Sequence, residues 1–157
     1  MQRQVNHHVF VIEREFTYAP SLVFFAFSDP QARQAWFSGP ADWDRGERHS
    51  DFRVGGLEVN EGGPKGGFVS RYEGRTLEIV PDERIITAFM MQVDGVPITA
   101  SLATVEFQPG DYGTKLKYTE QIAFLDGHDH LPQRIEGSEG MFDLFEAYLE
   151  AQHHKEG

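Results

Sequence analysis

The chain has 157 residues, of which 39% are hydrophobic and 13% aromatic, and it carries a formal net charge of -11 at pH 7. This length and composition predict one domain over residues 1–157 with a sizeable core. The acidic excess argues against nucleic acid or anionic membranes as partners, because binding them requires clustered lysine and arginine. The absence of cysteine excludes disulfides and cysteine-ligated zinc.

No apolar run reaches the ~20 residues that a membrane-spanning helix needs. The N-terminus shows no long apolar segment after its basic residue, so we expect no signal peptide. A cytoplasmic protein without a membrane partner is therefore expected.

The start of the chain predicts a strand followed by two short helices. Residues 8–18 alternate between apolar and polar positions, as a half-buried strand does. Ala19-Pro20-Ser21 ends this strand and opens a helix at residues 22–27, because proline is favoured in a first helical turn. Asp29-Pro30 then begins a second short helix, which ends near Trp36-Phe37.

The middle of the chain predicts a run of strands. Residues 40–50 are expected to form an irregular polar loop that carries Trp43. Alternation and turn signals then predict six strands, at residues 51–56, 68–73, 75–80, 84–92, 99–107 and 115–122. Asp94-Gly95 and residues 109–111 fit hairpin turns.

After a polar loop at residues 123–134, a long helix is expected at residues 135–152, where apolar side chains recur at helical spacing. The predicted order is therefore one strand, two short helices, six strands and one long helix. Such a run of antiparallel strands with segregated helices is typical of an α+β domain.

Two charged residues lie on stripes that should face the core. The apolar face of the strand at 115–122 carries Glu120, and the apolar face of the first strand carries Arg14. A buried charge is costly unless it is paired, neutralised or next to a wet cavity. Three interpretations remain open: a structural Arg14–Glu120 ion pair, a polar anchor for a ligand hydroxyl or carbonyl, or a general acid or base.

Three further motifs have weaker functional interpretations. Arg53 precedes Gly55-Gly56 and is either exposed or re-aimed toward a pocket by a glycine bulge. His128-Asp129-His130 has donors for a metal, but we interpret it as a solvated loop and expect no metal site. Residues 62–67 are glycine-rich but lack the spacing of a phosphate loop, so we expect a hairpin tip.

Several segments together resemble a known family. They are Ala19-Pro20-Ser21-Leu22-Val23-Phe24, Asp51-Phe52-Arg53-Val54-Gly55-Gly56, Ile79-Val80-Pro81-Asp82-Glu83-Arg84-Ile85, Tyr118-Thr119-Glu120-Gln121, Phe124-Leu125-Asp126-Gly127, and the closing residues 137–149. The chain resembles the SRPBCC superfamily of START and birch-pollen-allergen proteins, and within it the polyketide cyclase-like family related to the activator of the heat-shock-protein-90 ATPase. Where that family often has tryptophan, this chain has Phe37 and Ser138, which should reshape the pocket or its mouth.

The resemblance implies a helix-grip fold, in which a curved seven-stranded antiparallel sheet wraps around a long C-terminal helix. Two short helices would lie between the first two strands. It also implies that a hydrophobic or amphipathic small molecule binds between sheet and helix, without a cofactor. The residues expected to contact it are Arg14, Trp36, Phe52, Arg53, Ser70, Tyr72, Phe89, Met91, Ser101, Tyr118, Glu120, Phe142 and Phe145.

Two other functions stay open at this point. The first is a cyclase or hydratase-like enzyme for a ketone-bearing substrate, with Glu120 as acid or base and Tyr118 or Arg14 polarising the carbonyl. The second is a chaperone partner or a structural dimer module, which predicts a large exposed apolar patch. A homodimer is compatible with all three functions, with Trp43 and the 40–50 loop as contributors.

Overall fold

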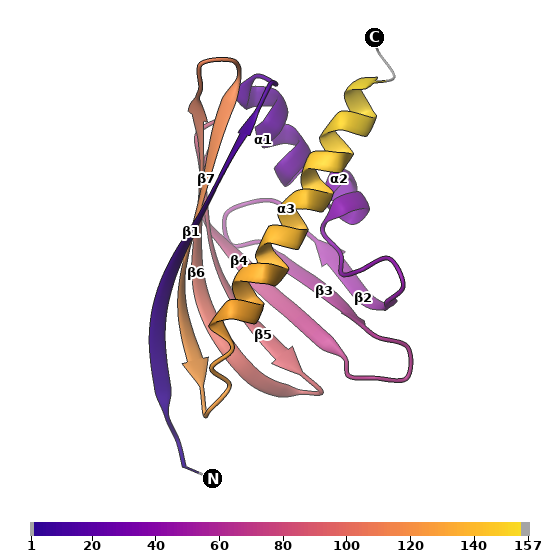
Figure 1. Ribbon diagram of the computed structural model, residues 1–157, viewed down its shortest axis with the longest axis vertical. Helices are drawn as coiled ribbons and strands as arrows, with labels where there is room; N and C mark the ends of the chain where they lie inside the picture. The colour runs from indigo at the N-terminus through magenta and orange to yellow at the C-terminus, as the bar shows by residue number, and fades with distance from the viewer. Residues whose placement is uncertain (1, 155–157) are drawn as a thin grey trace.

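The computed structural model describes residues 2–154. The elements follow in the order β1 (Val5–Phe16), α1 (Pro20–Ser28), α2 (Pro30–Trp36), β2 (Asp44–Ser50), β3 (Leu57–Gly63), β4 (Ser70–Val80), β5 (Arg84–Val93), β6 (Val96–Pro109), β7 (Thr114–Leu125) and α3 (Leu131–His154) (Figure 1). The strands form one antiparallel seven-stranded sheet in the order β1-β7-β6-β5-β4-β3-β2. The predicted α+β helix-grip fold is thus confirmed.

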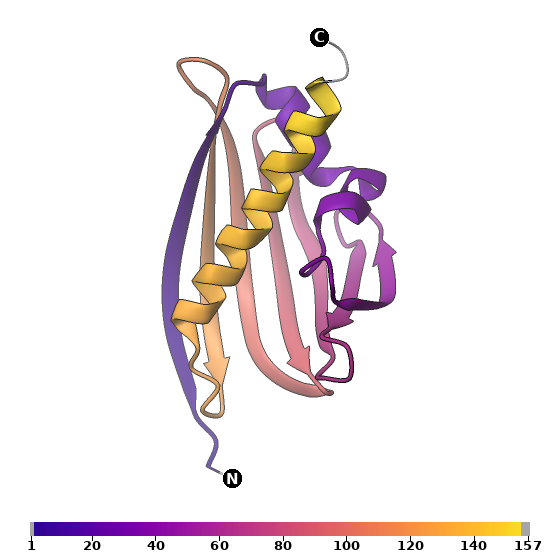
Figure 2. The ribbon, with the colours of Figure 1, turned by 45° about the vertical axis from the view of Figure 1, so that its right-hand side comes forward.

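The long helix α3 runs obliquely across one face of the curved sheet, and α1 and α2 lie beside its C-terminal half (Figures 1 and 2). The core fills the space between these layers. On the sheet, neighbouring strands align buried side chains in rows, such as Ile12, Tyr118, Val105 and Ile85. Rings and aliphatic groups from the helices close over these rows; they are Phe24, Phe27, Trp36, Phe142, Phe145 and Leu149.

The two short helices begin where the sequence predicts. Pro20 and Pro30 both lie in the first turn, where the missing proline N–H leaves no broken hydrogen bond. The Asp29 carboxylate accepts a hydrogen bond from the Ala32 N–H at 3.0 Å and so caps α2. The Trp36 indole then donates to the Ala26 carbonyl at 2.9 Å, which fixes α2 against α1.

The turns of the sheet also follow the sequence. Asp94 and Gly95 have φ of 50° and 80° and join β5 to β6. Positive φ at both central residues is the signature of the two-residue hairpin that matches strand twist. The glycine-rich stretch at 62–67 leads from the end of β3 into the loop before β4, as expected of a hairpin tip.

The number of strands is as predicted, but one predicted strand is absent and two others form a single strand. Residues 51–56 form bends and turns, and residues 68–73 and 75–80 belong largely to the single strand β4. In their place, β2 occupies part of the predicted 40–50 loop, and β3 lies at residues where no strand was predicted.

The reason for these errors is that β2 and β3 are polar. Their inner face is turned to a cavity rather than to the core, so β3 carries Glu58 and Asn60 where a core-facing strand would have apolar residues. In β4, Gly74 suggested a break, yet it is a ladder residue opposite Phe89.

No helix among residues 2–154 is long and apolar enough to cross a membrane.

Candidate functional site

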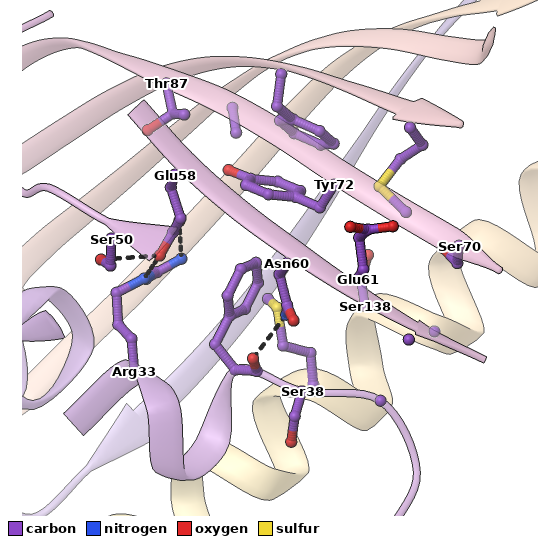
Figure 3. Close-up of a pocket in the computed structure, with 18 of the residues that line it drawn as sticks. Arg33, Ser38, Ser50, Glu58, Asn60, Glu61, Ser70, Tyr72, Thr87 and Ser138 are labelled. Atoms are coloured by element: carbon purple, nitrogen blue, oxygen red, sulfur yellow. Dashed lines mark hydrogen bonds and ion pairs between the residues drawn. The ribbon is translucent and has the colours of Figure 1, made fainter. Parts of the chain in front are cut away.

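A cavity of about 380 Å³ lies between the inner face of the sheet and α3. Its walls come from the end of α1, from α2 and the loop after it, from β2 to β7, and from the N-terminal part of α3. Apolar side chains form much of the lining; they are Phe27, Phe37, Trp43, Phe52, Ile85, Phe89, Met91, Ala103, Val105 and Met141. Between these apolar surfaces, the cavity exposes a few polar groups in defined positions (Figure 3).

One side of the cavity carries the ion pair between Arg33 of α2 and Glu58 of β3. The contact is bidentate, with Nε donating to Oε2 at 2.6 Å and Nη2 to Oε1 at 2.8 Å (Figure 3). Arg33 also donates to the Phe27 carbonyl at 2.8 Å. Burial opposes the charge of Arg33, but the charge and hydrogen bonds of Glu58 outweigh it and raise the pKa of Arg33.

Aromatic rings cover the Arg33 guanidinium. Its central carbon lies 4.2 Å from the ring centroid of Phe37, 5.1 Å from that of Trp36 and 5.2 Å from that of Phe27. Cation–π contacts of this length stabilise a desolvated cation. Arg33 is thus neutralised by its carboxylate and shielded by three rings.

The second polar cluster surrounds Glu120 of β7, whose side chain is 1% exposed. Its carboxylate accepts hydrogen bonds from Tyr118 at 2.7 Å, from Ser101 at 2.9 Å and from Arg134 at 2.7 Å. Arg134 also donates to the Thr99 hydroxyl at 2.6 Å. Burial raises the pKa of Tyr118 well above its usual range, and the Glu120 charge adds to the effect, so Tyr118 stays protonated and donates.

Tyr72 of β4 lies flat across the sheet between these two clusters. Its ring packs against Phe89 at 4.9 Å and edge-on against Phe37 at 5.1 Å between centroids. A Cβ added at Gly74 would lie 2.7 Å from the Tyr72 hydroxyl oxygen, so the ring covers the one residue of β4 that has no side chain. The hydroxyl points to the side where Glu58 and Thr87 lie (Figure 3).

The Arg14–Glu120 ion pair, one of the three interpretations left open by the sequence, does not form. Although β1 and β7 are neighbours, the register sets Glu120 opposite Phe10 and Arg14 opposite Leu116. Arg14 instead bridges to α3, where it contacts the carboxylates of Glu139, Asp143 and Glu146 at 2.5, 3.0 and 3.5 Å. The buried partner of Glu120 is Arg134.

The structure brings some of the predicted site residues to the cavity and not others. The residues that line it are Phe52, Ser70, Tyr72, Phe89, Met91, Tyr118 and Glu120. Trp36, Phe142 and Phe145 are in the core, and Ser101 is buried beneath Glu120. Arg53 is exposed and pairs with Asp51 at 2.7 Å, so the glycine bulge does not turn it inward.

Among the polar residues of the cavity that sequence reasoning missed are Arg33, Asn60 and Arg134. The Asn60 amide donates to the Phe37 carbonyl at 2.8 Å and leaves its own oxygen as an acceptor. A signal for Arg134 did exist, because Pro132 marks the first turn of a helix that begins before residue 135.

Trp43 and Ser138 also reach the cavity. The Trp43 ring lines it and meets Phe68 edge-on at 5.6 Å, while Ser138 of α3 is part of the lining where the related family often has tryptophan. Within residues 2–154, no group of three histidine, aspartate or glutamate side chains is placed to hold a metal ion.

Comparison with known proteins agrees with this architecture. The family described as activator of Hsp90 ATPase homolog 1-like protein matches residues 17–150. An uncharacterized protein from Rhizobium leguminosarum is 37% identical, with a TM-score of 0.91 over 96% of this chain and 99% of its own. The Mll3558 protein from Rhizobium loti is 40% identical, with a TM-score of 0.84 over 92% of this chain and 99% of its own.

A more distant structure shares the fold alone. The AHSA1-like protein from Aeromonas hydrophila is 23% identical, with a TM-score of 0.69 over 93% of this chain and 94% of its own. A search among curated proteins found no match. From the extent of the family match and the identity to the two rhizobial structures, the chain belongs to the activator of Hsp90 ATPase homolog 1-like family within the SRPBCC superfamily.

Proposed function

We propose that the protein binds an apolar or amphipathic small molecule in the cavity between the sheet and α3. The observation that carries this proposal is the cavity itself, which persists at about 380 Å³ in a core otherwise packed with aromatic rings. Small-molecule sites are commonly concave, mostly apolar and about 300–1,000 Å³ in volume, with a few polar groups for orientation. SRPBCC domains of this family are generally ligand-binding domains, which supports the same function.

Burial of apolar ligand surface would drive binding, at about 25 cal/mol per Å² removed from water. The rings of Phe37, Tyr72 and Phe89 present apolar surfaces, with Phe37 at 85° and Phe89 at 31° to the plane of Tyr72. Met91 and Met141 add flexible side chains that adapt to irregular shapes.

The enzyme alternative has less support from the geometry. A general acid or base must be within reach of the substrate and free to exchange a proton with it. Glu120 instead makes three hydrogen bonds, one of them to the Arg134 cation, and Arg14 lies outside the cavity lining. A cyclase mechanism with Glu120 and Arg14 on one carbonyl therefore does not fit this arrangement.

The dimer alternative stays a prediction. Val5, Val9 and Val11 are exposed on β1, which is an edge strand of the sheet. Edge strands with exposed apolar residues are common sites of pairing with another chain.

The test of the proposed function uses the neutral fluorophore N-phenyl-1-naphthylamine, excited at a wavelength that tryptophan does not absorb. Saturable enhancement of its emission is expected with the unmodified protein. Met91→Trp inserts a large ring into the cavity and should weaken binding roughly tenfold or more, since an interior tolerates little added volume.

Met90→Trp is the matched control, because Met90 is the adjacent residue of β5 and is 37% exposed, away from the cavity lining. It should leave the affinity unchanged. Absence of saturable binding, or equal affinity in the Met91→Trp and Met90→Trp proteins, would contradict the proposed function.

A further inference from the structure

Among the described residues, three arginines line the cavity; Arg45 is exposed, and the protein itself engages the two interior ones, Arg33 and Arg134. Arg33 is held bidentately by Glu58 and covered by rings. Arg134 binds Glu120 with one terminal nitrogen and the Thr99 hydroxyl with the other. Neither guanidinium is left as a countercharge for a ligand anion.

Unlike the two guanidiniums, the Tyr72 hydroxyl is not bound by another group: in the described part of the chain, no backbone or side-chain group makes a hydrogen bond to it. Every fully buried polar side-chain atom of the described residues does have a partner, so the Tyr72 hydroxyl oxygen is not fully buried. The hydroxyl oxygen is therefore accessible from the cavity that Tyr72 lines. Burial raises the pKa of Tyr72, and the Glu58 charge raises it further, so the group keeps its proton and can donate it.

The position of this donor is fixed. The tilted contact with Phe89 and the edge contact with Phe37 hold the ring, and the missing side chain of Gly74 makes room for its outer end. A phenol O–H held in an apolar wall is a specific point of recognition, because a ligand that leaves it without a partner loses a hydrogen bond that water had made.

We infer that the buried end of the ligand is uncharged and carries an oxygen acceptor that binds the Tyr72 hydroxyl, so that carboxylates and ammonium groups are excluded from this end. This inference rests on the proposed function. An anion at this buried end would lose its hydration near the Glu58 and Glu120 carboxylates, where Arg33 and Arg134 are already paired; Arg45, the third arginine of the lining, is exposed and donates to the Ser38 hydroxyl at 3.3 Å. A cation would meet carboxylates that already have partners.

The test uses a set of competitors with one skeleton, which displace bound N-phenyl-1-naphthylamine. The set comprises 2-acetylnaphthalene as acceptor, 2-ethylnaphthalene as its hydrocarbon relative, 2-naphthoate as anion and 1-(2-naphthyl)ethylammonium as cation. The decisive quantity is the affinity ratio of the ketone to the hydrocarbon. The difference in their hydration cancels when this ratio is compared between two variants.

Tyr72→Phe should lower that ratio about fivefold, the size of one neutral hydrogen bond, while the affinity for the hydrocarbon is retained. Tyr112→Phe is the matched control, because Tyr112 is 87% exposed and outside the cavity lining. It should leave the ratio unchanged. Both charged competitors should bind roughly tenfold or more weakly than the ketone in the unmodified protein.

The inference is overturned if the ratio is the same in the Tyr72→Phe and unmodified proteins, or if either charged competitor binds as well as the ketone. These results differ from a failure of the proposed function. If N-phenyl-1-naphthylamine does not bind saturably to the unmodified protein, both fail. If it binds and only the preference for the acceptor is missing, the cavity remains a binding site and the inference alone fails.

Discussion

The two arginines that join α3 to the sheet should differ strongly in their contribution to stability. Arg134 contacts Glu120, which is 1% exposed, whereas Arg14 contacts Glu139, Asp143 and Glu146, whose side chains are 46%, 70% and 44% exposed. Substitution of each arginine by methionine keeps much of the apolar stem and removes the charge. The pair Arg134→Met and Arg14→Met therefore isolates the effect of burial.

Removing one partner of a buried ion pair typically costs about 3–5 kcal/mol, because the other charge stays buried without compensation. Here the Tyr118 and Ser101 hydroxyls still donate to Glu120 in the Arg134→Met protein, which favours the lower end, about 3 kcal/mol. For Arg14→Met the freed carboxylates are solvated, so we expect a loss of about 0–1 kcal/mol. A loss of 3 kcal/mol corresponds to a fall in Tm of about 6–12 °C for a domain of this size.

The assay is equilibrium unfolding in urea, monitored by tryptophan fluorescence, with the free energy extrapolated to water. A third protein, Glu120→Gln/Arg134→Met, removes the uncompensated charge and keeps an acceptor for Tyr118. It should recover at least half of the lost stability. If Arg134→Met cost no more than Arg14→Met, or if Glu120→Gln gave no recovery in this background, the assignment of a buried, structural ion pair would be refuted.

Two further predictions concern Gly74 and Asp126. Gly74→Ala should destabilise the fold by about 1–3 kcal/mol because the added Cβ would lie 2.7 Å from the Tyr72 hydroxyl oxygen. In a Tyr72→Ala background the same change should be nearly neutral. Equal losses of unfolding free energy in the two backgrounds, measured in urea, would contradict the contact. Asp126 accepts hydrogen bonds from the Gln4 N–H and from Arg3, which lower its pKa below the ordinary 3.8, so its stabilising effect is complete above about pH 4 and is lost as the pH falls through the lowered pKa. The protection of the Gln4 amide against hydrogen exchange, relative to an unstructured peptide at the same pH, should fall in that window, and Asp126→Asn should remove this pH dependence.

The fold could be predicted well from the sequence in those elements where buried and exposed positions follow a regular pattern of apolar and polar residues. Alternating residues in β5, β6 and β7, proline at the helix starts and Asp94-Gly95 in the hairpin turn all reflect local physics, and the structure agrees with each. The failures lie in β2 and β3. There the binary pattern is lost because one face of the sheet borders the cavity, and polar side chains such as Glu58 and Asn60 take positions that would otherwise be apolar.

The candidate site shows a second limit. Periodicity identified Glu120 as a charge on an inward face, but it carries no information on register, and register decides which side chains meet across strands. The partner Arg134 lies in a stretch that was expected to be a loop, because its helical face has few apolar residues before Met141. Which residues of a strand face inward can thus be predicted from that strand alone, whereas a contact between two residues depends on how their two elements are placed relative to each other.

The two interior ion pairs explain why the polar anchor of the cavity is expected at Tyr72 rather than at Glu120. Arg33–Glu58 joins α2 to β3 and Arg134–Glu120 joins α3 to β7, so the groups that hold the walls together also cancel their charges. For Glu120 to act on a substrate, its contact with Arg134 would have to open at a cost of about 3 kcal/mol or more. That cost alone would slow a reaction by about two orders of magnitude. Tyr72 requires no such opening, since its hydroxyl already faces the cavity without a protein partner among residues 2–154.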